Sequence, residues 1–234
     1  LTQLNNVSYA QYGFATSGDH RVVLSGSEGQ TVNFTNSALS HSHFTELQIT
    51  NSADAGVTFA SIIYVDKELV ATESELVNSA NVYLASNVVI SGDDWHGSLS
   101  SNSQWALTQS QTIKGDFFLK SGALDLAGET LTIEGDLIHS GGTLNVNGGT
   151  LVVKGDYRIQ TPSSTEGEYG YSTGYLQMQN PADYVLVEGA FYVDSQAGGN
   201  GNGSYLSAGT FELKGDLTQL NNVSYAQYGF ATSG

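Results

Sequence analysis

The chain has 234 residues, a formal net charge of −16 with only seven lysines and arginines, and no cysteine. This charge argues against nucleic acid and anionic membranes as partners, and the lack of cysteine excludes disulfide bonds and thiol catalysis. Apolar residues make up 39%, enough for a continuous core, and the 28 glycines and two prolines suit strands and turns better than a collagen-like or disordered chain. No run of eighteen apolar residues occurs, so no membrane insertion is predicted.

The opening segment of the chain is repeated at its end. Residues 1–18 recur without a mismatch as residues 217–234. The two copies start 216 residues apart, so the sequence predicts a tandem repeat of 216 residues, of which this chain holds one period and an overlap. Because Leu217 directly follows Gly215-Asp216, we expect Leu1 to continue a Gly-Asp corner of a preceding repeat.

The next part of the chain shows short strand-like pieces. Residues 21–26 and 31–34 read as two strands joined by a glycine turn. Residues 35–110 are less regular, with strand-like pieces at 44–50, 57–66, 81–90 and 104–109. Helical spacing of apolar residues at 67–80 leaves a helix open there, although the short strands on either side favour another strand-and-turn unit.

A twenty-residue repeat begins at residue 111 and is the dominant signal. Alternating strands end in Gly-Asp at 115–116, 135–136 and 155–156, and the frame returns at 184–193 and 210–220. One such unit cannot bury its apolar face alone, so the units must stack. The pattern predicts an all-β fold, a parallel β-helix or β-solenoid with coils of about 20 residues and longer Tyr-rich loop insertions.

This prediction extends to the whole chain. We expect residues 1–234 to form one continuous β-solenoid, with regular Gly-Asp coils at 1–34 and 111–234 and less regular coils at 35–110. Roughly eight to ten coils per 216 residues are expected from the number of strand sets, at about 4.8 Å per coil.

The residue before each glycine of the Gly-Asp frame alternates in charge along the chain. In a stack these side chains lie one strand spacing apart, where opposite charges attract. Each exposed contact is worth about 0.2–1 kcal/mol, so the column sets register more than stability. Chance alternation is the alternative, and we favour a register ladder. Its predicted members are Lys114, Glu134, Lys154, Glu188 and Lys214.

Aspartates occupy equivalent corners of the same frame, interrupted once by Ala190. A column of carboxylates could bind Ca²⁺, which prefers oxygen ligands. The simpler interpretation, which we favour, is that each aspartate accepts turn N–H groups after a glycine with positive φ. Calcium is therefore a weak candidate, and no other cofactor is predicted. The aspartates are Asp116, Asp136, Asp156 and Asp216.

Tyrosines gather in the three longest insertions, which follow equivalent positions of the repeat. Exposed tyrosines beside Gly, Ser and Asn suit stacking on sugars or contact with a protein. Insertions in repeat proteins also gather on one face, which is often the binding face. The alternative, slightly favoured, is that the loops fold back as plugs that bury the surface of the stack. The candidates are Tyr169, Tyr171, Tyr175, Tyr205, Tyr225 and Tyr228.

No catalytic residues are predicted. Polysaccharide-cleaving β-helices need a carboxylate cluster or Ca²⁺ together with a basic residue. The only arginines are Arg21 and Arg158, and the sequence places neither in an obvious acidic cluster. The chain also has no nucleophile motif, phosphate-binding loop or Cys/His cluster.

Several segments resemble repeats of a known group of proteins. Residues 141–160, 174–192 and 208–219, followed by 14–34, are similar to β-solenoid repeats in large exported or cell-surface proteins of Firmicutes-type bacteria. The resemblance implies an extracellular or cell-surface location and no assigned activity. It covers roughly residues 111–234 and 1–34 and supplies no catalytic residues.

The sequence therefore predicts a structural protein and not an enzyme. We expect a repeat segment of a long extracellular stalk, adhesin or fibre whose partner is itself, end to end. Two alternatives stay open. One is a carbohydrate-binding surface module that uses the tyrosine loops on host or cell-wall glycans, and the other is a polysaccharide lyase-like enzyme.

Overall fold

The computed structural model describes residues 1–4, 8–71, 74–85, 88–92, 95–195, 205–220, 222 and 230–232. The chain divides into two compact units, Leu1–Ser100 and Ser101–Gly234. Their described residues form an all-β structure of short strands in parallel sheets, with two 3₁₀ turns. No described helix is long and apolar enough to cross a membrane.

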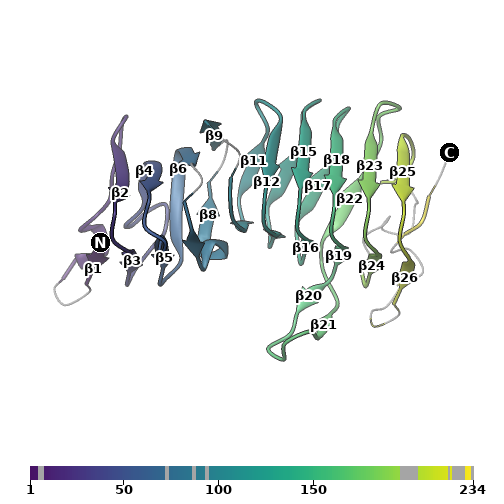
Figure 1. Ribbon diagram of the computed structural model, residues 1–234. Helices are drawn as coiled ribbons and strands as arrows, with labels where there is room; N and C mark the ends of the chain where they lie inside the picture. Colours follow the sequence, from purple (N-terminus) through teal and green to yellow (C-terminus); the bar gives the residue numbers. More distant parts are fainter. Residues whose placement is uncertain are drawn as a thin grey trace. The chain divides into compact units, whose positions relative to one another are not determined.

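In the second unit the chain visits three parallel sheets in a fixed order (Figure 1). The first sheet consists of β11 (Gln104–Ala106), β14 (Ala123–Asp125), β17 (Thr143–Asn145) and β22 (Tyr175–Gln177). The second consists of β12 (Gln111–Ile113), β15 (Thr130–Ile133), β18 (Thr150–Val153), β23 (Tyr184–Val187) and β25 (Thr210–Leu213). The third contains β13 (Phe117–Leu119), β16 (Leu137–His139), β19 (Tyr157–Ile159), β24 (Phe191–Val193) and β26 (Leu217–Gln219).

Within each of these three groups, every strand after the first pairs in register with the strand one repeat earlier. Leu124, Leu144 and Leu176, for example, are successive partners in the first sheet. Side chains alternate between the two faces of a strand, so this register places the inward side chains in columns. The columns of the other two sheets are fully buried: Leu131, Leu151 and Val185; Ile133, Val153 and Val187; Phe117, Leu137, Tyr157 and Phe191.

An antiparallel ribbon interrupts the pattern after β19. It consists of β20 (Thr161–Pro162) and β21 (Tyr169–Gly170), and it projects from the parallel sheets (Figure 1). Because the chain returns to the first sheet at β22, the insertion leaves the stacking of the strands before and after it unchanged.

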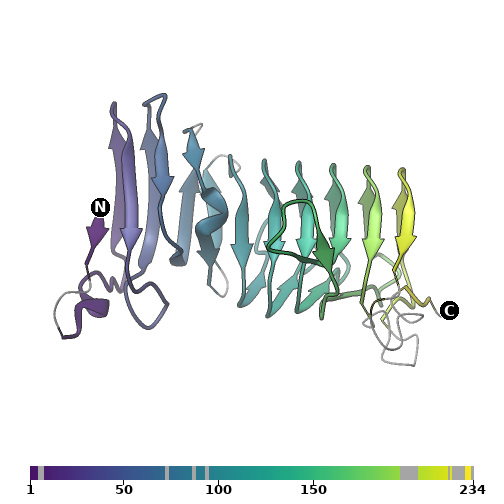
Figure 2. The same ribbon diagram turned by 90° about the horizontal axis from the view of Figure 1, so that it is seen from below.

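The first unit has longer strands and less regular pairing (Figure 2). One sheet has the order β1 (Thr2–Gln3), β3 (Gln30–Phe34), β5 (Val57–Phe59) and β7 (Leu76–Val77). The other runs through β2 (Arg21–Gly26), β4 (Phe44–Asn51), β6 (Ile63–Ala71), β8 (Val82–Leu84) and β10 (Leu99–Ser101), and β9 (Val89–Gly92) also pairs with β6. The 3₁₀ turns are Ala10–Tyr12 and Ser79–Asn81.

The segment 67–80, where a helix was left open, belongs to the sheets. It contains the end of β6, all of β7 and the start of the second 3₁₀ turn. The strand-and-turn alternative is therefore confirmed for its described residues. The piece 57–66, in contrast, is not one strand, because β5 ends at Phe59 and β6 begins at Ile63.

Candidate functional site

The five charged residues of the predicted ladder follow the strands of the second sheet directly. Lys114 Nζ lies 3.7 Å from Glu134 Oε1, and Lys154 Nζ lies 2.6 Å from the same oxygen. Lys214 Nζ lies 2.9 Å from Glu188 Oε1, and Lys154 also interacts electrostatically with Glu188. Hydrogen bonds from Lys154 and Lys214 lower the pKa values of the Glu134 and Glu188 carboxyl groups, respectively.

Glu134 is the best place to test this ladder, since it contacts a lysine on either side. We expect Glu134→Gln to lower Tm by about 1–3 °C at low salt, because two exposed ion pairs are lost. The difference between variant and parent should shrink in 1 M NaCl, where the Debye length is about 3 Å. Thermal unfolding at both salt concentrations measures it, and Glu166→Gln, in the exposed part of the β20–β21 ribbon, is the control. A salt-independent loss would contradict an electrostatic ladder.

The aspartates of the Gly-Asp corners link each repeat to the next. Asp116 Oδ1 accepts the backbone N–H of Asp136 at 2.8 Å, and Asp136 Oδ1 accepts that of Asp156 at 2.7 Å. Asp156 Oδ1 in turn accepts the N–H of Ala190 at 2.9 Å. Alanine at this corner lacks the carboxylate but still supplies the backbone donor. Burial raises the pKa of Asp136, the central carboxyl group of this column.

In three of the four predicted aspartates, Asp116, Asp136 and Asp156, Oδ1 accepts a backbone N–H of the next repeat. The exposed Asp216 accepts the Phe191 N–H through its backbone oxygen. Among the residues that the structure describes, no group of three His, Cys, Asp or Glu side chains is placed to hold a metal ion.

The prediction that the corner glycines have positive φ is wrong. Left-handed φ values occur at other corners, such as Gly122 and Gly142, both at +79°. The Gly-Asp glycines are needed for space, because a Cβ on Gly155 would lie 2.6 Å from the carbonyl oxygen of Gly135. The glycines form their own ladder, in which the Gly155 N–H donates to Gly135 O at 3.0 Å.

Three of the predicted tyrosines pack onto neighbouring side chains. The guanidinium carbon of Arg158 lies 4.6 Å from the ring centre of Tyr169 and 3.8 Å from that of Tyr192. The ring of Tyr175 stacks on that of Tyr205, with centroids 4.9 Å apart. These three rings are half-buried against other side chains, and the choice between plug and binding face stays a prediction.

Tyr171 differs from them, since 57% of its surface is exposed. It borders an open cavity of about 450 Å³ that is lined mainly by hydroxyl-bearing side chains and glycine. Tyr225 and Tyr228 lie outside the described residues. Their counterparts in the first copy of the eighteen residues, Tyr9 and Tyr12, are 76% and 50% exposed.

Both arginines contact acidic residues, contrary to the sequence-based expectation. Arg158 Nη2 lies 2.6 Å from Asp156 Oδ2. Arg21 lies 2.9 Å from Glu46 and 2.5 Å from Glu68. The spacings of 25 and 22 residues in this second group are irregular, so only the β2–β4–β6 register brings these charges together. Arg21 thus pairs with acids on stacked strands, and Arg158 pairs with an acid two residues earlier in the chain.

A buried histidine in β16 was also missed from the sequence. His139 is fully buried, and its Nε2 donates to the Gly142 carbonyl oxygen at 3.1 Å. This fixes the tautomer, so Nδ1 accepts from the Tyr157 hydroxyl at 3.1 Å. Burial lowers the pKa of His139 to about 4 and raises that of Tyr157. The signal was present, because the repeat aligns His139 with the inward-facing Leu119.

Comparison with known proteins leaves these features unassigned. No protein-family model matches the chain, and neither the curated proteins nor the solved structures include a match. The resemblance to surface proteins of Firmicutes-type bacteria therefore stays a prediction.

Proposed function

We propose that the chain is a structural repeat segment, a parallel β-solenoid whose coils stack and continue end to end in a long extracellular stalk, adhesin or fibre. The observation that carries the proposal is the in-register parallel pairing of strands one repeat apart in all three sheets of the second unit. Each strand between two others uses the backbone groups on both edges, so stacking itself gives the chain its order.

The chemistry of the described surface supports a mechanical role. Its charged columns are engaged in ion pairs, and its corner carboxylates accept backbone hydrogen bonds. A protein without cysteine that holds its coils together by backbone pairing and buried columns needs no disulfide bonds. The acidic composition and the resemblance stated above support an extracellular or cell-surface location.

Electron microscopy of the purified protein tests the proposal. If coils are spaced by about 4.8 Å, each 216-residue repeat should advance the structure by roughly 40–50 Å along one axis. Chains with one, two and three repeats should therefore form rods whose length rises by this step. Discrete globules whose diameter grows only slowly with repeat number would rule out the stalk.

A carbohydrate-binding surface is the second candidate, favoured by the exposed Tyr171 and its cavity. The cavity is lined by Ser140, Thr161, Pro162, Ser163, Gly170, Tyr171 and Thr173. An aromatic face beside hydroxyl groups suits a sugar ring. Binding on a glycan array should fall at least tenfold for Tyr171→Ala, as expected when an aromatic contact worth about 1.4 kcal/mol or more is removed. Leu39→Ala, at an exposed apolar residue of the first unit, is the control; equal binding by all three proteins would reject this site.

A further inference from the structure

The eighteen residues that occur twice are observed in two different settings. The copy at 217–234 contacts the repeat before it, since β26 pairs with β24 through Leu217 and Phe191. The copy at 1–18 contacts the repeat after it, since β1 pairs with β3 through Thr2 and Asn33. The structure therefore shows the same strand once with its preceding neighbour and once with its following neighbour.

The two pairings use different backbone groups of that strand. Toward β24, the carbonyl of Asp216 accepts the Phe191 N–H at 2.8 Å, and the N–H of Leu220 donates to Val193 O at 2.8 Å. Toward β3, the carbonyl of Leu1, equivalent to Leu217, accepts the Asn33 N–H at 2.9 Å.

The remaining contacts with β3 follow the same alternation. The carbonyl of Gln3, equivalent to Gln219, accepts the Thr35 N–H at 3.3 Å. In the C-terminal copy, the backbone groups of even-numbered residues therefore bond to the preceding strand, β24. The equivalents of its odd-numbered residues bond to the following strand, β3, and to Thr35 just after it. Since alternate groups of a strand point to opposite neighbours, both sets of bonds can form at once.

An aromatic contact shows the same division. Phe230 lies with its ring centroid 5.3 Å from both Phe191 and Phe211, in the repeat before it. Its equivalent, Phe14, lies 5.4 Å from Phe34 and 5.5 Å from Phe44, in the repeat after it. One phenylalanine at this position can therefore contact aromatic rings on both sides.

The inward column of the third sheet is open at this strand. Phe191 is fully buried, but its partner Leu217 is 52% exposed. At the other copy, Leu1 is 45% exposed, although Val32 in β3 is fully buried. The same leucine thus has a neighbour only in the preceding strand in one copy and only in the following strand in the other.

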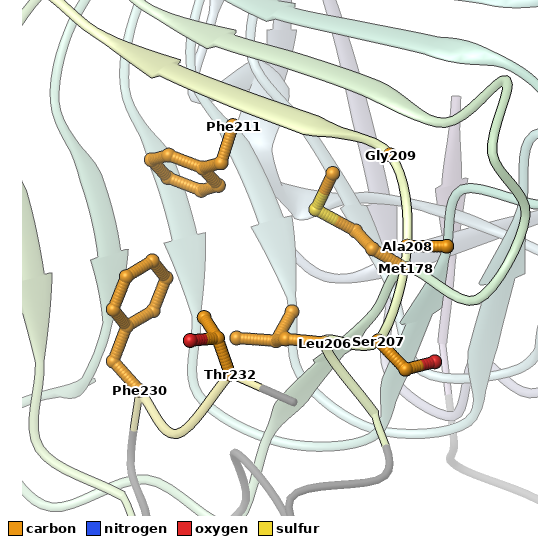
Figure 3. A pocket seen from close by; sticks show the side chains of 8 residues that line it. All are labelled: Met178, Leu206, Ser207, Ala208, Gly209, Phe211, Phe230 and Thr232. Carbon is orange, nitrogen blue, oxygen red and sulfur yellow. The ribbon is translucent and has the colours of Figure 1, made fainter. Parts of the chain in front are cut away.

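Each end also has an open cavity at the shared phenylalanine. Figure 3 shows the side chains of Phe211, Phe230, Met178 and Leu206 around the cavity in the second unit, whose volume is about 320 Å³. The cavity of about 280 Å³ in the first unit is lined by Leu1, Thr2, Gln3, Leu4, Ala10, Gly13 and Phe14.

From these observations we infer that the face formed by β25, β26 and Phe230 is an interaction surface for the next 216-residue copy of this chain. In the joined molecule the eighteen-residue sequence occurs once at the junction, as the end of one copy and the start of the next. In the joined molecule, strand 217–219 lies between β24 and the β3 strand of the following copy. Its phenylalanine lines both cavities from a single position, and side chains of the adjoining copy close each of them. The inference rests on the proposed end-to-end solenoid and specifies the contacts at its junction.

A chain in which residues 1–234 are followed directly by residues 19–234 tests this junction. The natural sequence lacks cysteine, so one introduced thiol reports on a single site. Leu217→Cys is placed once in the 234-residue chain and once at the central strand of the two-copy chain. We expect the thiol to react about a hundredfold more slowly in the central strand, because reaction there requires local opening.

Thr218→Cys is the matched control, since Thr218 pairs with Tyr192 and faces outward on the same strand. Its labelling rate should be the same in both chains. Equal rates for Leu217→Cys in both chains, or equal slowing of both thiols, would overturn the proposed junction.

Electron microscopy of the same two-copy chain separates this result from the proposed function. A rod twice as long as that of the 234-residue chain with a fast Leu217→Cys reaction would retain the stalk but reject the junction. A two-copy chain that is not elongated would reject the stalk as well.

Discussion

Replacing Gly155 by alanine is expected to cost about 3 kcal/mol of unfolding free energy. A Cβ at this position would lie 2.3 Å from Asp136 Oδ1 and 2.6 Å from Gly135 O. Both atoms belong to the preceding repeat, so the two corners must separate. Overpacking of this kind costs about 1–3 kcal/mol, and the charge-assisted bond from Asp156 N–H to Asp136 is lost in addition, worth about 1.5–3 kcal/mol.

Gly170→Ala provides the matched control for this change. Gly170 has negative or extended φ, like Gly155, but a Cβ there would meet no atom within 4 Å. Chemical denaturation should give nearly the parental midpoint for this variant and a clearly lower one for Gly155→Ala. Equal midpoints for the two variants would show that the corner glycines are not in close contact.

The buried histidine should make stability depend on pH between about 4 and 6.5. Because burial lowers the pKa of His139 from 6.5 to about 4, the unfolded chain binds a proton in this range that the folded protein does not. The unfolding free energy is therefore highest above pH 6.5 and falls as the pH drops toward 4. A shift of this size corresponds to about 3 kcal/mol.

The contribution of His139 is measured as a difference between proteins. Urea unfolding between pH 4 and 7.5 should show a steeper loss of stability for the parent than for His139→Phe, whatever the carboxylates contribute to both. His20→Gln, at an exposed histidine, should retain the parental slope. Parallel curves for the parent and His139→Phe would mean that the imidazole is not buried in its neutral form.

The sequence was most informative where the repeat length is constant. At a fixed period of twenty, equivalent residues must lie on neighbouring strands, so the partners of Glu134 follow from counting alone. The role of the Gly-Asp glycine did not follow, because both a left-handed turn and a close approach of two backbones select glycine. Only the structure distinguishes Gly155, which needs space, from Gly142, which needs positive φ.

The first unit was harder to predict for a physical reason. Its strands recur at uneven intervals, and β6 is long enough to pair with β8 at one end and β9 at the other. Counting residues therefore does not show that Arg21 and Glu68 meet. The role of the tyrosine loops was ambiguous, because loops with exposed rings and loops with packed rings have the same kind of amino-acid sequence. Tyr169 packs against Arg158 and Tyr171 is exposed, although they are two residues apart.

The hydrogen bonds that the carboxylates of the Gly-Asp corners accept from the next corner all run in one direction. In each pair the carboxylate belongs to the earlier repeat and the N–H to the later one, as with Asp116 and Asp136. A ribosome makes the earlier repeat first, so an acceptor already in place awaits every newly emerging amide. During synthesis each newly made corner can therefore bond to a carboxylate of the repeat made before it.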